Sequence, residues 1–195
     1  ADEPLTELGG KTPLEHAQTP NMDRMAREGA CGMLRTIPDG YEAGSDIANM
    51  AVLGYAPEKY YTGRGPLEAL SMGVDLAPDD VAYRCNLVTV ENNTMADFSA
   101  GHISSAEGAD LLASLQDEMP GIMLRAGISY RNLLVVHGGK GAVSTPPHDI
   151  VGQDITPYLP AGGDADLLRN GMEKSRQVFG QHPANVSRIN AGKRP

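Results

Sequence analysis

The sequence predicts a mixed α/β protein, in which helices and loops come first and an α+β module with a mostly antiparallel sheet follows. Two observations support this prediction. Up to residue 76, helix-start signals alternate with loops rich in Gly and Pro, whereas strand, strand, helix and strand patterns follow in that order from residue 81. Between them, the run Asp75–Asp80 contains three aspartates and Pro78. We therefore expect a domain boundary after residue 78.

The first helix is indicated by its end signals. Pro20 suits the first helical position, Asp23 lies near the positive end of the helix dipole, and Thr19 is a residue type that caps free amides. Gly29 is a typical stop. A short strand is expected next, at residues 32–36.

A second helix is expected after the glycine-rich loop that ends at Ser45, over residues 46–53. The polar stretch at residues 60–66 is interpreted as a loop, and it holds Arg64 between two glycines. A short helix at residues 67–72 is expected to follow.

The α+β module begins with apolar, β-branched segments. We expect strands at residues 81–90, 94–99 and 127–136, a helix that begins after Ser104, and a final helix at residues 164–179. Ser104 and Glu107 form a capping-box pattern, and the helix after them places Leu111, Leu112, Leu115 and Met119 inward. We expect the antiparallel sheet to be covered on one side.

Composition excludes several classes of protein. The formal net charge of −9 and the absence of a Lys/Arg stripe disfavour nucleic acids and acidic membranes as partners. No apolar run approaches the roughly 20 residues of a membrane helix. Two cysteines cannot build a disulfide framework, so we expect a reducing cytoplasm. The five histidines show no HExxH spacing, so no zinc site of that type is indicated.

Ser45 is the most informative single residue. A Gly-Ser pair where a loop enters a helix exposes a hydroxyl beside amides and a dipole that favour an anion. An enzyme could hold a phosphoryl group there while the serine attacks it. The same pattern also fits a simple helix cap. A Ser-His-Asp hydrolase is disfavoured, because no Gly-x-Ser-x-Gly elbow surrounds the serine.

Several charged residues stand where a solvated surface charge is less expected, and guanidinium groups bind carboxylates and phosphates. The candidates for an anion pocket are Arg64, Arg84, Arg131, His102, His148 and Asp149. The alternative for each arginine is an ordinary surface position, and for the His148–Asp149 pair it is a surface turn.

Longer strings resemble one enzyme family. The string TPNMDRMAREG, at residues 19–29, resembles a segment that recurs in the alkaline phosphatase superfamily. The runs that resemble archaeal-type cofactor-independent phosphoglycerate mutases are residues 38–76 and 83–104, SYRNLLVV, TPPHDIVGQ and the final NAGKRP. Together they cover nearly the whole chain in the right order.

This resemblance implies a fold and a reaction. Residues 1–78 would form part of an alkaline-phosphatase-like core that holds Ser45 as the nucleophile. Residues 79–195 would form an inserted α+β domain that grips the substrate, together with the linker that returns to the core. The family transfers phosphate between 3-phosphoglycerate and 2-phosphoglycerate in glycolysis, through a phosphoserine and two divalent ions (manganese, magnesium or zinc). Ser45 would also touch metal. The substrate-binding residues would be Arg64, Arg84, His102, Arg131, His148 and Asp149.

The resemblance also implies that parts are missing, since the family's other metal ligands would lie before Ala1 and beyond Pro195. We therefore expect a fragment that is inactive alone, holds no metal stably and self-associates through exposed core surface. Two other functions stay open. One is a related metal-dependent phosphohydrolase or phosphonate-processing enzyme, and the other is a non-catalytic module that binds anions or a protein partner.

Overall fold

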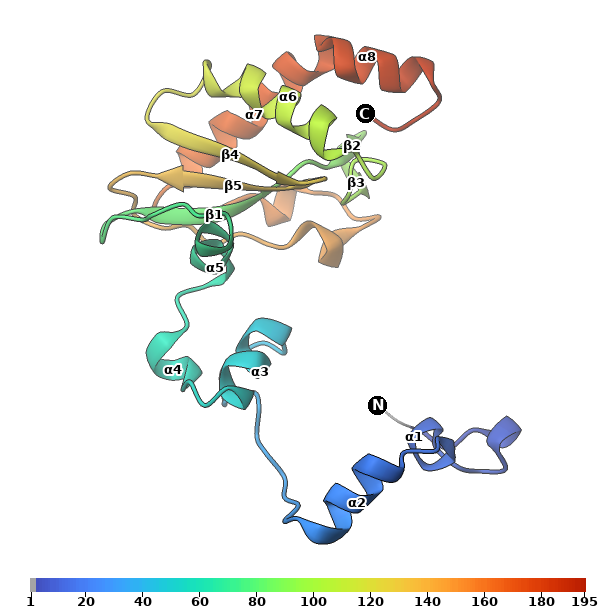
Figure 1. Cartoon of the computed structure of the whole chain (residues 1–195). Helices are drawn as coiled ribbons and strands as arrows, with labels where there is room; N and C mark the ends of the chain where they lie inside the picture. The colour runs from blue at the N-terminus through green and yellow to red at the C-terminus, as the bar shows by residue number, and fades with distance from the viewer. Residues whose placement is uncertain (1–2) are drawn as a thin grey trace. The chain divides into compact units, whose positions relative to one another are not determined.

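A computed structural model describes residues 3–195, and its chain divides into two compact units, one up to Tyr61 and one from Thr62 to Pro195 (Figure 1). The predicted fold class is confirmed, since helices combine with an antiparallel sheet. In the part of the chain that the structure describes, no helix has both the length and the apolar character of a membrane span.

The first unit consists of short helices joined by extended segments. They are the 3-10 helix η1 (Thr6–Leu8), α1 (Pro13–His16), α2 (Pro20–Glu28), α3 (Ser45–Val52) and α4 (Pro57–Tyr60). The predicted α2 is confirmed, with Pro20 in its first turn and Gly29 after its last residue. The predicted side-chain cap is wrong, because the Thr19 hydroxyl donates to the Asp23 carboxylate and accepts no amide.

The strand predicted at residues 32–36 is absent, and this segment is irregular. A strand is stabilised by hydrogen bonds to a neighbouring strand, and no described segment pairs with it. Apolar side chains of this unit are therefore left in solvent, among them Met25 and Met33. Ile47 of α3 is a buried exception.

The second unit contains the sheet and the longer helices. Its elements are α5 (Arg64–Ser71), β1 (Val81–Asn86), β2 (Thr89–Glu91), β3 (Thr94–Asp97), α6 (Ser105–Gln116), β4 (Ile122–Ile128), β5 (Arg131–Val136), η2 (Pro147–Ile150), η3 (Thr156–Tyr158), α7 (Ala165–Gln181) and α8 (Pro183–Asn190). The main sheet has the order β1-β5-β4 with both pairs antiparallel, and β2 and β3 form a separate hairpin.

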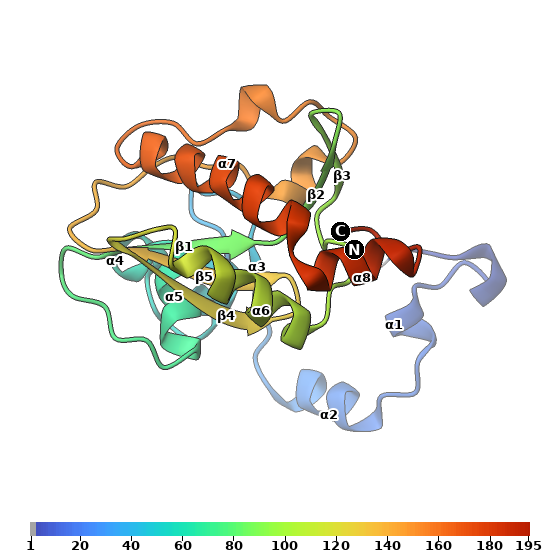
Figure 2. The same ribbon diagram turned by 90° about the horizontal axis from the view of Figure 1, so that it is seen from above.

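The main sheet is covered on both faces, which corrects the expectation of one covered side (Figures 1 and 2). Successive side chains of a strand point to opposite faces. Leu133 and Val135 of β5 therefore pack with Ala69 of α5 on one face, and Leu134 and Val136 pack with α6 and α7 on the other. All four side chains are buried because β5 is the central strand.

The single strand predicted at residues 127–136 is two strands of a hairpin. The chain turns at Ser129 and Tyr130, and Ser129 adopts a left-handed φ of 57°. The buried Asn132 holds the turn, because its side-chain amide donates to the Tyr130 carbonyl and its carbonyl oxygen accepts from the Gly127 amide. The strand predicted at residues 81–90 is likewise divided, into β1 and β2.

The helix predicted after Ser104 is confirmed. Ser104 and Glu107 form the expected capping box. The inward-facing residues Leu111, Leu112, Leu115 and Met119 are all buried. The final predicted helix is α7, with Asp164 before its first residue. The helix α8 after it was not predicted.

The two compact units divide between Tyr61 and Thr62, earlier in the chain than the predicted boundary after residue 78. Helix α5 falls in the second unit because it packs against β1. The division into a phosphatase-like core and an inserted domain stays a prediction.

Candidate functional site

Ser45 is the first residue of α3, and its side chain is exposed. Gly44 precedes the helix in an extended conformation, so the loop enters the helix directly at Ser45, one residue before the expected start of the helix. The next residue, Asp46, accepts a hydrogen bond from the Tyr61 hydroxyl at 2.5 Å. The Ser45 hydroxyl therefore lies at the positive end of a helix, where an anion is favoured. Its role as a nucleophile stays a prediction.

Arg84 lies in β1 and is half-buried. Its Nε lies 3.6 Å from Oε2 of Glu68 on α5, with 27% of the arginine side chain exposed. Nε has no hydrogen-bond partner within the described residues. The guanidinium is therefore only partly neutralised by Glu68, and it retains capacity for an anion.

The strand register brings three arginines to one face of the sheet. Arg84 of β1 and Arg125 of β4 both stand opposite Leu133 of β5, and Arg131 precedes Leu133 by two residues. Residues directly opposite each other in antiparallel strands point to the same face, as do residues two apart. All three side chains therefore lie on the same face of the sheet as Leu133 and Val135, the face against which α5 packs. Arg125 and Arg131 are exposed.

Arg125 was not among the predicted site residues, because no strand was expected at residues 122–126. A signal was available in residues 122–128, where Arg125 follows the apolar run Ile122–Leu124. Without the register that joins β4 to β5, however, nothing in the sequence indicates that Arg125 and Arg84 flank the same leucine.

An aromatic row continues from Arg131 to the His148 loop. The Arg131 guanidinium carbon lies 5.1 Å from the centre of the Tyr130 ring, which meets Phe98 edge to face at 5.7 Å. Phe98 meets the His148 ring at 6.3 Å. Nε2 of His148 lies 3.4 Å from Oδ1 of Asp149. A series of contacts through Tyr130 and Phe98 thus connects three of the predicted substrate residues, Arg131, His148 and Asp149.

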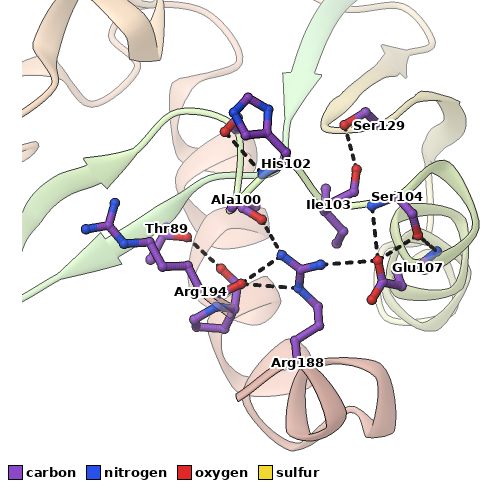
Figure 3. Close-up of polar contacts among 12 residues, drawn as sticks. Thr89, Ala100, His102, Ile103, Ser104, Glu107, Ser129, Arg188 and Arg194 are labelled. Carbon is purple, nitrogen blue, oxygen red and sulfur yellow. Dashed lines mark hydrogen bonds and ion pairs between the residues drawn. The ribbon is translucent and has the colours of Figure 1, made fainter. Parts of the chain in front are cut away.

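His102 lies at the end of a left-handed turn. Ala100, Gly101 and His102 have φ values of 48°, 61° and 51°. The backbone amide of His102 donates to Oγ of Ser99 at 3.3 Å, and the imidazole is exposed (Figure 3). Because Phe98 begins this turn, the turn joins His102 to the aromatic row.

Arg64 is the first residue of α5, where the sequence indicated a loop; the helix begins three residues earlier than expected. Gly65, the next residue, is buried against the Ala82 carbonyl of β1. Arg64 itself lies exposed at the start of the helix.

Two carboxylates with lowered pKa values support the loops around the sheet. Burial raises the pKa of Asp164. Hydrogen bonds from the Lys140 amide, the Tyr83 hydroxyl and the Gly141 amide together lower this pKa by more than burial raises it, so the net shift is downward. The same balance lowers the pKa of Asp97. Both carboxylates are held charged by local donors, which suits a structural role.

Metal ligands do not gather in the described residues. Among residues 3–195, no group of three or more His, Cys, Asp or Glu side chains could hold a metal ion. Ser45 could supply one oxygen ligand, but a divalent ion in a protein site takes several ligands. The donor set described here does not fit a complete metal site.

A cavity of about 690 Å³ lies elsewhere in the second unit, on the side of α6 and α7. Its lining is mainly apolar and includes Leu112, Leu134, Ile150, Leu168 and Phe179. Of the predicted substrate residues, only Arg84 lines it. The charged candidates therefore lie mostly outside this cavity.

A protein-family model described as 2,3-bisphosphoglycerate-independent phosphoglycerate mutase matches residues 26–185. Enzymes of this name from Methanothrix thermoacetophila and Methanothermobacter thermautotrophicus are 49% and 52% identical to the whole chain. The chain spans about half the length of these relatives, 50% and 49%. Among solved structures, the cofactor-independent phosphoglycerate mutase from Thermoplasma acidophilum is 30% identical with a TM-score of 0.59, and the match covers all of this chain and 54% of that one.

Proposed function

The chain belongs to the 2,3-bisphosphoglycerate-independent phosphoglycerate mutase family, and on that basis we propose that it contributes the phosphoryl-accepting serine and the substrate-binding surface of an enzyme that interconverts 3-phosphoglycerate and 2-phosphoglycerate. The observation that carries the proposal is the group of three arginines, Arg84, Arg125 and Arg131, on one face of the sheet. Phosphoglycerate carries a phosphate and a carboxylate, and guanidinium groups bind both in a bidentate manner.

Ser45 is the proposed nucleophile. Its exposure at the first residue of α3 supports this role, because the helix dipole favours a phosphoryl group at that end. In this proposal, residues 1–78 are part of the phosphatase-like core, and residues 79–195 are the inserted domain that grips the substrate.

The reaction has two transfers. Oγ of Ser45 attacks the phosphorus of 3-phosphoglycerate, the bond between phosphorus and the 3-oxygen breaks, and the serine proton ends on that oxygen. The 2-hydroxyl of the retained glycerate then attacks the phosphorus of the phosphoserine, the bond between phosphorus and Oγ of Ser45 breaks, and the hydroxyl proton returns to that Oγ. Positioning and charge neutralisation supply most of the catalysis in such transfers. The proposed substrate-binding residues are Arg64, Arg84, His102, Arg125, Arg131, His148 and Asp149.

Two divalent ions, manganese, magnesium or zinc, belong to the proposal for the whole protein. When bound, such ions neutralise charge on the phosphoryl oxygens. The described residues hold no complete ligand set for them. Because this ligand set is incomplete, we expect the chain alone to be inactive. The two transfers above are described only through groups that this chain supplies.

The proposal includes a cytoplasmic, glycolytic role. It also includes self-association of the isolated chain, since Met25 and Met33 are among the exposed apolar side chains of the first unit. Light scattering of the isolated chain measures this directly.

The test uses the full-length protein that carries this chain, supplied with manganese, and measures conversion of 3-phosphoglycerate by a coupled assay. Ser45→Ala should reduce turnover to background. The matched control is Ser71→Ala, at the exposed end of α5, which should leave turnover within about twofold of the wild type. Mass spectrometry of quenched reactions should find phosphate on Ser45 of the wild type.

Each alternative function predicts a different result. A phosphohydrolase would release inorganic phosphate from simple phosphate esters faster than it isomerises phosphoglycerate. A non-catalytic binding module would turn over neither substrate. Full activity of the Ser45→Ala variant would refute the proposed nucleophile.

A further inference from the structure

The left-handed turn that ends at His102 is held from outside by a distant part of the chain. L-residues rarely adopt positive φ, and here Ala100 and His102 do so on either side of Gly101. Such a conformation persists only where surrounding contacts impose it. The contacts that impose it therefore decide where His102 points.

Within the turn, Asp97 supplies the first set of contacts. Its Oδ1 accepts hydrogen bonds from the Ser99 amide at 2.8 Å and the Ser99 hydroxyl at 2.6 Å, and its Oδ2 accepts from the Gly101 amide at 3.0 Å. The Asp97 carboxylate thus fills the concavity that these amides form. The turn is not an open anion site.

Arg188 of α8 supplies the second set, from far along the chain. Only 2% of its side chain is exposed. Its Nη2 donates to the Ala100 carbonyl, and its Nη1 donates to Oε2 of Glu107 at 3.1 Å. Nε and Nη2 also donate to the Arg194 carbonyl, at 3.2 and 2.8 Å. One planar guanidinium therefore joins the turn, the start of α6 and residue 194 (Figure 3).

The segment after Arg188 closes over the same turn. Nη1 of Arg194 donates to the Ala96 carbonyl at 2.9 Å and lies 3.8 Å from Oδ2 of Asp97. The Thr89 hydroxyl donates to the Pro195 carbonyl at 2.6 Å. Figure 3 shows the His102 ring pointing away from Arg188, on the other side of the turn. The 188–195 segment thus holds the backbone while leaving the imidazole exposed.

We propose that Arg188 is a positioning residue, which fixes the Asp97–His102 turn and thereby sets the places of His102 and of the Phe98 ring that contacts His148. This inference rests on the proposed function, because it assumes that His102 and His148 face the substrate. Arg188 acts only through the turn and does not touch the substrate.

The first test measures amide hydrogen exchange in full-length Arg188→Lys. Lysine keeps the charge but lacks the planar fork that reaches Glu107, Ala100 and Arg194 together. Exchange at the amides of Gly101 and His102 should become about tenfold faster or more, while the amides of β5 stay unchanged. Unchanged exchange at the turn would overturn the inference, and so would equal acceleration in β5, which indicates a general loss of stability.

A second variant disturbs the same contact without removing the arginine. In Gly101→Ala, the new Cβ would lie 3.2 Å from Nη2 of Arg188 and 3.2 Å from Cβ of Arg194. The matched control is Gly73→Ala, since Gly73 has a similar φ of 66° but nothing within 4 Å of the added carbon. Gly101→Ala should reproduce the fast exchange at the His102 amide, and Gly73→Ala should not.

The kinetic readout connects the turn to substrate. Both Arg188→Lys and Gly101→Ala should raise the KM for 3-phosphoglycerate about tenfold with a smaller change in kcat, because binding geometry is lost and Ser45 is untouched. An unchanged KM beside faster exchange would overturn the inference. If the wild type does not turn over 3-phosphoglycerate, the proposed function fails instead, and hydrogen exchange still decides whether Arg188 holds the turn.

Discussion

Replacing Gly65 with alanine tests how closely α5 packs on the sheet. An added Cβ would overlap the carbonyl oxygen of Ala82 and lie 3.1 Å from the Tyr83 amide nitrogen. Both are backbone atoms of β1, so neither can move aside by changing a rotamer. The same helix buries Ala69 completely, in a cluster that includes Leu133.

The size of the effect follows from this overlap. Ordinary van der Waals contact of a Cβ begins near 3.4 Å, so α5 must move away from β1 by more than about an ångström. Overpacking of a close-packed core costs roughly 1–3 kcal/mol. Because the clash is with backbone, we expect the upper end, a loss of about 3 kcal/mol in the free energy of unfolding.

The matched control is Gly180→Ala in α7. Gly180 is also helical, but it is exposed and has nothing within 4 Å of an added Cβ. Alanine is the better helix former, so this variant should be more stable than the wild type by about 0.5–1 kcal/mol.

The assay is urea unfolding of the 195-residue chain, followed by far-ultraviolet circular dichroism. Gly65→Ala should lower the urea midpoint and Gly180→Ala should raise it, with similar slopes. If Gly65→Ala unfolds at the wild-type midpoint, the close approach of α5 to β1 is not present in solution and the packing described above is wrong.

Two further predictions follow from the carboxylates and the arginines. The pKa of Asp164 is lowered in the folded state from its ordinary value of 3.8, so the contribution of this carboxylate to stability is complete above that value and is lost as the pH falls through the folded pKa. Asp164→Asn should therefore remove part of the decrease in the urea midpoint that the wild type shows between about pH 5 and 2. An equal decrease in the variant and the wild type would contradict this. In the full-length enzyme, Arg125→Ala should raise the KM for 3-phosphoglycerate roughly 10–100-fold, since a charge-assisted hydrogen bond contributes about 1.5–3 kcal/mol. The control is Arg169→Ala, at an exposed position of α7 on the other side of the sheet, which should leave the KM unchanged. Equal effects of the two substitutions would contradict an anion site on the face of the sheet that α5 covers.

Local signals were enough to predict several elements. Pro20 and Gly29 mark the ends of α2, and Ser104 with Glu107 marks the start of α6. These signals depend on contacts between residues a few positions apart, so the sequence contains them in full. A strand that ends at Val136 was also expected, from its own apolar and β-branched residues.

The pairing of strands could not be predicted from such local signals. The turn at Ser129 was missed because a left-handed serine has no strong sequence signature and depends on the buried Asn132 beyond it. The strand expected at residues 32–36 did not form, because a strand needs a partner and none lies beside it in the described residues.

The sequence by itself determined the family resemblance, the ends of α2, the start of α6 and the choice of Ser45, because each of these depends on neighbouring residues. Only the tertiary structure decided that Arg125 joins Arg84 and Arg131 on one face. It alone showed that the Arg188 guanidinium donates a hydrogen bond to the Ala100 carbonyl, 88 positions away. The physical reason is that strand register and buried hydrogen bonds join residues that are remote along the chain, and such partners are defined only once the chain has folded.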